Sequence, residues 1–440
     1  MSRERDRITK KLEKNPAQEC NKIQQKFYPE LFSKFDQITD PRHSSYIDYS
    51  SKVMLGTMYY KGIAGISSMQ GMTREFNDEI VAKNLYRFMG SNTKKYLPHA
   101  VTVNEFLERL DPVELEKIQS DIVNRMIRRK TFDDAKVLGK WLVLIDGTEL
   151  DEGNTKKNEN YLSRCYNRGK ENEFTKYYRS VLEAKIYLGN DLVCSMATET
   201  IENSAEYNEK KLSEEEIKQD CESKAFVRIA AKIKKRFPRL PVCIVADSLY
   251  VSEKVLQLCR DNRWDYIIRY KEVPHRWKRN IRQSRRKIKQ EKRNISMGSS
   301  LGDRDVNVLK FTETKIRKGK PVTTEYAWIT SMEIKDKNAQ RLVKAGRCRW
   351  KIENHGFNRQ KRWQGDIEHA CSFHERAQKN HYLMEQISDF MKQLYEYFFL
   401  KKNEIRKVQK NISSELLASF GRQLTETEDI PVKLNETVLN

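Results

Sequence analysis

Three carboxylates stand out from their surroundings in this sequence of 440 residues. Asp146 follows the apolar run LVLI, and Asp247 follows the apolar run CIVA. Glu353 is the single acid in residues 347–363, a segment with six lysines and arginines. A buried carboxylate without a partner is strongly destabilising or becomes protonated. An acid at the end of a core strand therefore calls for an explanation beyond packing.

Oxygen donors of this kind suit hard divalent cations. Mg²⁺ prefers carboxylates and water as ligands. Two such ions, about 3.5 to 4 Å apart, can activate a water or a 3′-hydroxyl and stabilise the leaving oxygen of a phosphodiester. If the fold brings Asp146, Asp247 and Glu353 together, they could hold two Mg²⁺ ions, with Mn²⁺ as a substitute. The cations around Glu353 would then contact a phosphate backbone.

Each acid also has a simpler structural interpretation. Asp146 precedes a glycine and could form a turn, and Asp247 could cap a helix that begins near residue 252. Glu353 could pair with Arg349, four residues earlier on the same helix, for a few tenths of a kcal/mol. A third carboxylate in an otherwise cationic helix favours the metal-site interpretation.

Hydrophobic patterning predicts the elements that carry these acids. Residues 140–150 and 241–250 each predict a buried strand that ends in a polar turn. Two strand-like runs flank Gly189-Asn190, which predicts a hairpin. A serine and three glutamates open the segment 213–237, and lysines and an arginine end it, as expected for a helix.

The predicted order is strand, hairpin, helix, strand, helix, strand, and then a helix from about Ala339 that carries Glu353. This order predicts an α/β catalytic core with an RNase H-like mixed sheet and flanking helices. On the last helix, Arg349 and Gln360 fall near the face of Glu353, and Arg359 falls on the far side.

The sequence divides into five segments. Residues 1–130 have apolar residues at helical spacing and predict an all-α N-terminal domain. The α/β core occupies 131–270 and resumes at 326–400. Between its two parts, residues 271–325 predict a basic arm and a small β insertion. Residues 401–440 are polar and charged, and we expect a loosely packed tail.

Charge and composition favour a nucleic-acid partner. The net charge is +22 and the pI is about 9.4, which favours binding to a polyanion. No window has the 18 or more apolar residues of a membrane span, and the N-terminus lacks the apolar stretch of an export signal. The eight cysteines form no CxxC pair. These features predict a cytoplasmic, nucleoid-associated protein with reduced thiols and no membrane contact.

The motifs IDGT, VADSLY and RCRWKIENHGFNRQK together resemble the D-D-E transposases of bacterial insertion sequences. The resemblance is to the cut-and-paste group with a β insertion before the catalytic glutamate. It covers residues 140–400 and, more weakly, the N-terminal helices. It implies catalytic and metal-binding roles for Asp146, Asp247 and Glu353. It also implies cleavage of double-stranded DNA at terminal inverted repeats, joining of 3′-hydroxyl ends to target DNA, and a homodimer that pairs two ends.

The sequence departs from that group at one motif. The group's signature is Tyr-x2-Arg-x3-Glu-x6-Lys, and Arg349 and Glu353 fit it. Gly346 occupies the tyrosine position, and Gln360 occupies the lysine position, with Lys361 one residue later. The departures bear on the subgroup and on whether a hairpin intermediate forms.

Several cationic residues are expected to contact DNA. Arg349 and Lys361 are assigned to phosphates near the scissile bond. The arm at 274–293 has ten lysines and arginines against one glutamate, and Trp277 among them could add stacking. The alternative is a solvated run of charge. The arm residues expected to bind DNA are Arg276, Lys278, Arg279, Arg282, Arg285 and Arg286.

For several other residues that could have a functional role, a purely structural role is the better interpretation. Trp350 and Trp363 are predicted to be core anchors rather than base-stacking residues. Residues 63–90 are predicted to be packing helices rather than a helix-turn-helix. The His and Cys residues at 369–374 fit no standard zinc spacing. Three glutamates near strand ends are interpreted as exposed surface residues: Glu149, Glu199 and Glu202.

These observations lead to the hypothesis of a DNA transposase that works by two-metal phosphoryl transfer. One alternative is an RNase H-like nuclease that cuts DNA without strand transfer. Another is an inactive, domesticated DNA-binding protein.

Overall fold

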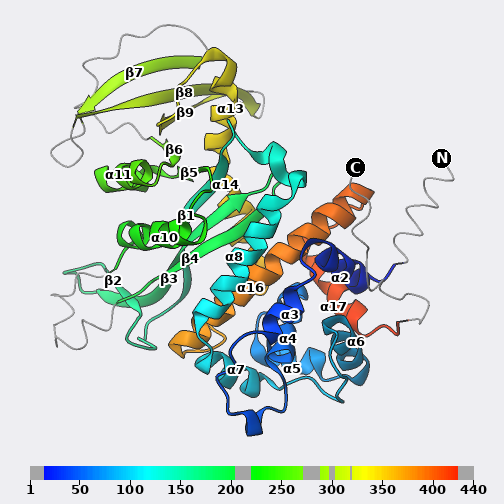
Figure 1. The fold of residues 1–440 in the computed structure, drawn as a ribbon. Coiled ribbons are helices and arrows are strands. Elements are labelled where there is room, and N and C mark those ends of the chain that lie inside the picture. Colours follow the sequence, from blue (N-terminus) through cyan, green and yellow to red (C-terminus); the bar gives the residue numbers. More distant parts are fainter. Residues whose placement is uncertain (1–13, 204–219, 271–287, 297–302, 318–319, 425–440) are drawn as a thin grey trace. The chain divides into compact units, whose positions relative to one another are not determined.

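The computed structural model describes residues 14–203, 220–270, 288–296, 303–317 and 320–424. The chain forms two compact units (Figure 1). The helical unit combines Met1–Ile118 with Gln360–Asn440, and the α/β unit comprises Gln119–Arg359. In sequence, the α/β unit is thus inserted between two parts of the helical unit.

In the described residues, a mixed sheet of nine strands organises the α/β unit. Its strand order is β2-β3-β1-β5-β6-β9-β8-β7, and β4 also pairs with β3. Strands β1, β5 and β6 are mutually parallel, and the other pairs are antiparallel. The strands are β1 (Trp141–Gly153), β2 (Leu162–Tyr166), β3 (Phe174–Tyr187), β4 (Val193–Ile201), β5 (Val242–Ala246), β6 (Asp265–Arg269), β7 (Ile288–Ser296), β8 (Asp303–Arg317) and β9 (Lys320–Thr330).

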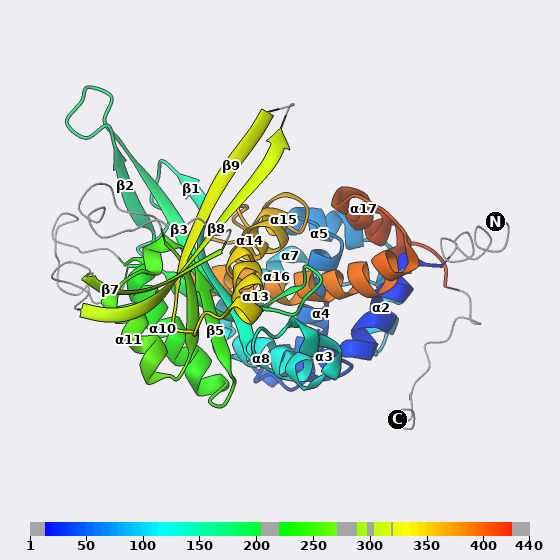
Figure 2. The same ribbon diagram turned by 90° about the horizontal axis from the view of Figure 1, so that it is seen from above.

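Helices cover both faces of this sheet. Helices α10 and α11 lie on one face, and α13 and α14 lie on the other (Figures 1 and 2). In α10 the buried residues recur at three- and four-residue intervals, as in Phe226, Ile229 and Ile233, so one apolar stripe faces β3 and β4. The helical elements of this unit are η2 (Lys130–Ala135), α10 (Glu222–Arg236), η3 (Ser248–Tyr250), α11 (Glu253–Asp261), α13 (Asp336–Arg347), α14 (Arg349–Ile352) and η5 (Glu353–Phe357).

The sheet confirms the main sequence prediction for this unit, a mixed α/β sheet with flanking helices. Every residue of β5 is buried, as expected for a parallel strand covered on both faces. The hairpin at Gly189-Asn190 is also confirmed. Both residues adopt positive φ values, 80° and 52°, between β3 and β4. The start of the helix predicted for 213–237 lies outside the described residues, and α10 begins at Glu222.

The end predicted for the first core strand was wrong. We expected a turn at Asp146-Gly147, but β1 continues to Gly153. The reason is that β1 has two different neighbours. Its parallel pairing with β5 ends at Leu144, whereas its antiparallel pairing with β3 runs on through Asp146 and Gly147. Hydrogen bonds on that one side therefore keep the strand extended past the acid.

The segment for which we predicted a β insertion supplies strands at one edge of the sheet. Strand β9 pairs with β6, β8 pairs with β9, and β7 pairs with β8. The hairpin expected about residues 317–320 is confirmed, because Arg317 pairs with Lys320 across the turn. The basic arm before this insertion lies largely at 271–287, outside the described residues.

The helical unit is built around one long helix, α16 (Glu375–Tyr395), which packs against α2, α4 and α7. The other helices confined to this unit are α2 (Pro16–Phe27), α3 (Leu31–Asp36), η1 (Ser44–Tyr46), α4 (Ser51–Ile63), α5 (Met69–Phe76), α6 (Glu79–Met89), α7 (Ala100–Arg109), η6 (Glu396–Leu400), η7 (Lys401–Asn403) and α17 (Gln409–Phe420). Helices α8 (Pro112–Arg128) and α15 (Asn358–Arg362) each contain a boundary between the units. Within the described ranges, no helix has the length and apolar character needed to cross a membrane.

The structure assigns the C-terminal part of the chain to a different unit from the one that we predicted from the sequence. We had placed residues 326–400 in the catalytic core, but those from Gln360 onward pack with the N-terminal helices, because α16 contacts them along its length. The expected loose tail contains helix α17, whose Ile412, Leu416 and Phe420 are buried.

Candidate functional site

The sheet register places Asp146 and Asp247 side by side. Leu144 of β1 is the parallel partner of Val245 of β5, and each aspartate lies two residues further along its strand direction. Asp247 directly follows β5, where its Oδ1 accepts a hydrogen bond of 2.8 Å from the Leu249 amide. Asp247 therefore caps the short 3-10 turn η3, whereas the helix that we expected it to cap, α11, is capped by Ser252.

Arg349 connects the strand acid to the helix acid. Its Nη1 donates to Asp146 Oδ2 at 2.9 Å, and its Nη2 lies 3.6 Å from Glu353 Oε2. The segment that carries Glu353 therefore contacts β1 through Arg349. The predicted ion pair between Arg349 and Glu353 is also present, and it includes Asp146 as a third member.

The region around Glu353 is not the single regular helix that we predicted. Helix α13 ends at Arg347, α14 follows after Cys348, and Glu353 opens a π-helical turn before α15. Such wide turns are rare and occur often at functional sites. In the middle of this turn, Gly356 packs against Lys185 of β3, and a Cβ there would lie 3.2 Å from Lys185 Cε.

Lys185 belongs to a buried polar network beneath that turn. Its side chain is 1% exposed and lies 3.8 Å from the carboxylate of Glu183, which is 0% exposed. Glu183 also accepts hydrogen bonds from Ser195 and Thr198 of β4. Glu183 is the antiparallel partner of Asp146. The network therefore adjoins the strand residue paired with Asp146 and, through Lys185, the turn that carries Glu353.

Burial dominates the electrostatics of Asp146. Burial raises the pKa of Asp146 to about 7, and the Arg349 guanidinium opposes this rise. The nearby carboxylates of Asp247, Glu222 and Glu353 raise the pKa further. The mutual influence shows that four acids share one region, although the sequence singled out three.

Glu222 is the acid that sequence reasoning missed. It begins α10 and accepts a 2.6 Å hydrogen bond from the Tyr250 hydroxyl, just after Asp247. A Cβ on Gly147 would lie 2.6 Å from its carboxyl carbon, so Gly147 makes room for this side chain. Burial raises the pKa of Glu222, and Asp247 and Glu149 add to the rise. The signal in the sequence was Gly147, directly after Asp146, because a glycine within a core strand indicates that another group packs closely against the backbone there.

The donor chemistry of this region fits a divalent cation. Asp146, Asp247 and Glu353 offer only carboxylate oxygens, as hard ions require. In the described part of the chain, however, no three Asp, Glu, His or Cys side chains converge closely enough to hold an ion as placed. Arg349 supplies the positive charge between Asp146 and Glu353 in this arrangement.

Both departures from the transposase signature have packing explanations. Gly346 lies against Trp328 of β9, where a Cβ would be 2.6 Å from the indole ring. A tyrosine at this position would overlap that ring. Gln360 is fully buried, and its amide donates to Gln386 and Asp389 of α16 at 3.0 and 2.8 Å. Gln360 therefore packs within the helical unit.

The predicted phosphate-binding residues have different surroundings. Arg349 is 15% exposed and engaged with the acids. Lys361 belongs to the helical unit and forms a 2.7 Å ion pair with Glu368. The six arm residues lie outside the described residues: Arg276, Lys278, Arg279, Arg282, Arg285 and Arg286.

Some surface assignments were wrong. Trp350 and Trp363 are not core anchors, because they are 51% and 43% exposed. The Arg349 guanidinium lies 4.5 Å from the centre of the Trp350 ring, so an exposed aromatic adjoins the acids. Glu199 is largely buried and pairs with Arg228 and Lys232, contrary to the expected exposure.

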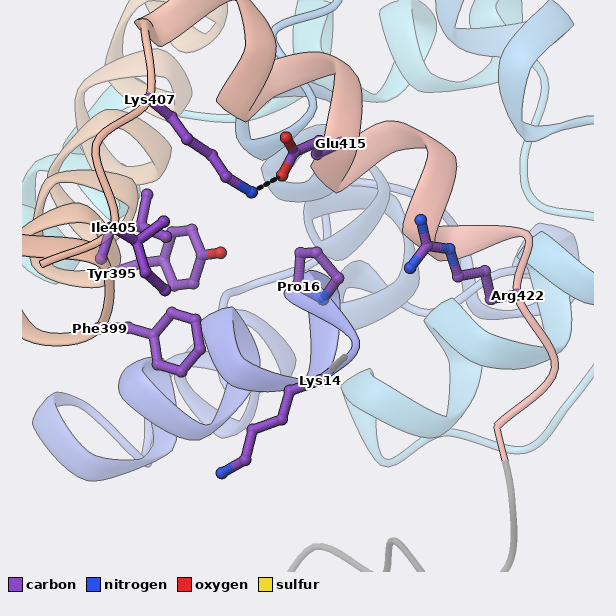
Figure 3. A pocket seen from close by; sticks show the side chains of 9 residues that line it. Lys14, Pro16, Tyr395, Phe399, Ile405, Lys407, Glu415 and Arg422 are labelled. Atoms are coloured by element: carbon purple, nitrogen blue, oxygen red, sulfur yellow. Dashed lines mark hydrogen bonds and ion pairs between the residues drawn. The ribbon is translucent and has the colours of Figure 1, made fainter. Parts of the chain in front are cut away.

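A separate cavity of about 290 Å³ lies within the helical unit (Figure 3). Tyr395 and Phe399 form its apolar wall, and Lys407 pairs with Glu415 at its edge. None of the four acids lines this cavity.

Comparison with known proteins bears on the same acids. Residues 219–384 match the family described as Transposase DDE domain, a stretch that contains Asp247 and Glu353 and ends before α16 does. No curated protein matches the chain. A solved structure titled "Cryo-EM structure of piggyBac transposase synaptic complex with hairpin DNA (SNHP)" is similar at 11% identity and a TM-score of 0.43, covering 91% of this chain and 79% of that one. The family match supports a transposase domain in this part of the chain.

Proposed function

We propose that the protein is a DNA transposase that cleaves the ends of a mobile element and joins the 3′-hydroxyl ends to target DNA. The observation that carries this proposal is the Arg349 contact with both Asp146 and Glu353, beside Asp247. It brings Glu353, from a distant helix, to Asp146 of β1 and close to Asp247, which directly follows β5; Asp247 and Glu353 lie within the stretch that matches a transposase domain. The proposed substrates are the terminal inverted repeats of the element and a target DNA duplex.

The roles of the residues follow from their chemistry. Asp146, Asp247 and Glu353 would hold two divalent ions, Mg²⁺ or Mn²⁺, which lower the pKa of a bound water or hydroxyl and stabilise the leaving oxygen. Glu222 adds negative charge near these ions. It also accepts a hydrogen bond from Tyr250 and packs against β1 at Gly147. Arg349 presents a guanidinium, whose geometry matches a phosphate group. The exposed Trp350 offers an aromatic face beside it.

The helical unit would recognise the DNA ends. Ser68 caps α5 and Asp78 caps α6, so two short helices follow one another closely within residues 63–90. We predicted a packing role for these helices, and a helix-turn-helix that reads the DNA ends is the alternative. The basic arm and Lys361 would bind the backbone.

The decisive experiment is a cleavage and joining assay with the full-length protein. The substrate is a duplex that carries the inverted repeats bounding the coding region, with Mg²⁺ or Mn²⁺ and a supercoiled target plasmid. We expect nicks at the repeat ends and covalently joined products. Asp146→Asn and Glu353→Gln should abolish both while duplex binding remains.

Three results would overturn this proposal. Cleavage without joined product indicates a nuclease. Binding without cleavage under any divalent ion indicates a non-catalytic DNA-binding protein. If the Asp146→Asn variant still cleaves DNA, Asp146 is not a catalytic residue.

A further inference from the structure

The turn between β3 and β4 has an unusual backbone. Gly189, Asn190 and Asp191 adopt φ values of 80°, 52° and 71°. Left-handed conformations are uncommon for residues other than glycine, and two such residues in succession persist only where surrounding contacts hold them. The Leu188 amide donates to the Leu192 carbonyl at 3.0 Å and closes the turn. The turn therefore holds Asp191 in a defined place at the end of the hairpin.

The Asp191 carboxylate contacts the segment that carries Glu353. Its Oδ1 accepts a hydrogen bond from the Lys351 ammonium of α14. The same oxygen lies 3.9 Å from His355 Nε2 in the π turn. Lys351 and His355 lie two residues before and two residues after Glu353. Asp191 therefore contacts this segment on both sides of the acid.

Strand β3 connects this contact to the acid on β1. Asp146 pairs with β3 at Glu183. Further along the same strand, Lys185 packs against Gly356 of the π turn. The strand then ends in the turn that carries Asp191. One strand and the turn after it therefore contact both β1 at its acid and the segment that carries the helix acid.

The same turn lies near the residue that joins α13 to α14. Burial raises the pKa of the Cys348 thiol to about 11, Lys351 opposes the rise, and Asp191 adds to it. Burial also raises the pKa of the Tyr187 hydroxyl to about 12, and Cys348 and Asp191 contribute. These mutual influences show that the side chains share one partly buried region. The contact between the hairpin and α14 therefore extends beyond a single ion pair.

We propose that Asp191 is a positioning residue for the acidic site. It holds α14 and the π turn in place, so that Arg349 and Glu353 keep their positions relative to Asp146 when divalent ions bind. Replacing residues that orient metal ligands from outside the coordination sphere typically lowers metal affinity or activity by roughly 10- to 100-fold. The inference rests on the proposed function, because it assigns a role in the same site. Asp191 precedes the stretch that matches a transposase domain.

The test separates the chemical step from DNA binding in the full-length protein. Asp191→Asn keeps a residue that tolerates a left-handed backbone but removes the charge that pairs with Lys351. With Mn²⁺ and the repeat duplex, we expect kcat for cleavage to fall about tenfold and KM to stay unchanged. Mn²⁺ affinity in titration calorimetry should fall several-fold. Lys351→Met should have the same effects, and the double variant should be no worse than either single one, because the pair acts as a unit. Lys351→Arg keeps the pair and should lose far less activity than Lys351→Met.

Asp133 supplies a matched control in the same unit. It pairs at 2.7 Å with Lys136, and the side chains of that pair are 47% and 30% exposed, close to the 42% and 30% of Asp191 and Lys351. Asp133→Asn should leave kcat, KM and Mn²⁺ affinity unchanged. Hydrogen exchange separates positioning from general destabilisation. Asp191→Asn should speed exchange of the amides in 349–357 and leave those of β5 unchanged.

The results distinguish this inference from the function on which it rests. If the unchanged protein cleaves DNA but Asp191→Asn keeps full kcat and Mn²⁺ affinity, only the positioning role is overturned. If Lys351→Met raises KM alone, Lys351 contacts DNA directly, and the positioning role is again overturned. Faster exchange throughout the α/β unit in Asp191→Asn would show a general structural role instead. If the unchanged protein neither binds nor cleaves the duplex, the proposed function fails, and the positioning role fails with it.

Discussion

Arg349 is the cation that contacts both Asp146 and Glu353. It satisfies one oxygen of Asp146 and lies near Glu353, so an acid in a buried strand has a cationic neighbour. That neighbour does not fully offset burial, because the pKa of Asp146 still rises to about 7. A carboxylate that the fold disfavours in its charged form is typical of functional sites.

The first prediction concerns stability and pH. The pKa of Asp146 rises from 3.8 to about 7 on folding, so the folded protein binds more protons between these values and its stability falls as pH rises through them. With chelator present, Asp146→Asn should raise the free energy of unfolding by about 1 to 3 kcal/mol at pH 8 and change it little at pH 4. Urea denaturation at both pH values measures this. Asp48→Asn, at an exposed position, is the control; an equal gain at pH 4 and pH 8 would contradict the prediction.

A second prediction tests Glu222. Glu222→Gln keeps the shape beside Gly147 and an acceptor for Tyr250, but removes one negative charge. We expect the affinity for Mn²⁺ in titration calorimetry to fall several-fold, with little loss of stability. Glu171→Gln, on an exposed loop, should leave Mn²⁺ affinity unchanged. A stability loss with unaltered Mn²⁺ affinity would mean that Glu222 is only structural.

At the scale of elements, the apolar runs were enough to predict β5 and the hairpin at Gly189. Sequence could not show that β3 would hold β1 extended past Asp146, because that pairing is set by a strand far along the chain. It also could not show the π turn, which lies where Gly356 meets a buried lysine of another strand. Glu222 was missed because an acid in a first helical turn has a sufficient local explanation.

The third prediction concerns the buried pair beneath the π turn. Lys185→Met leaves the Glu183 carboxylate without its cationic neighbour, and removal of one member of a buried pair costs about 3 kcal/mol. The double change Glu183→Gln with Lys185→Met should recover most of that stability in urea denaturation. Lys232→Met removes a more exposed partner of Glu199 and should cost less than about 1 kcal/mol. A double variant no better than the single one would contradict this interpretation.

At the scale of the whole molecule, the net charge of +22 determines how the proposed binding to DNA should depend on salt. Each phosphate that a cation neutralises releases counterions, so affinity depends steeply on salt. With six to ten phosphate contacts, we expect the affinity for duplex DNA to fall by about 10³ to 10⁵ between roughly 50 and 200 mM salt. Fluorescence anisotropy over that range measures the slope. Affinity that stays constant would rule out binding dominated by the cationic surface.

The insertion of the α/β unit between two parts of the helical unit has a consequence for biosynthesis. Helices α2, α4 and α7 leave the ribosome early, whereas α16, which packs against all three, is translated only after Gln119–Arg359. At usual elongation rates, the nascent chain waits on the order of tens of seconds between these events. During that interval the apolar sides of the early helices lack their main covering helix, and they are the natural binding sites for a chaperone on the emerging polypeptide.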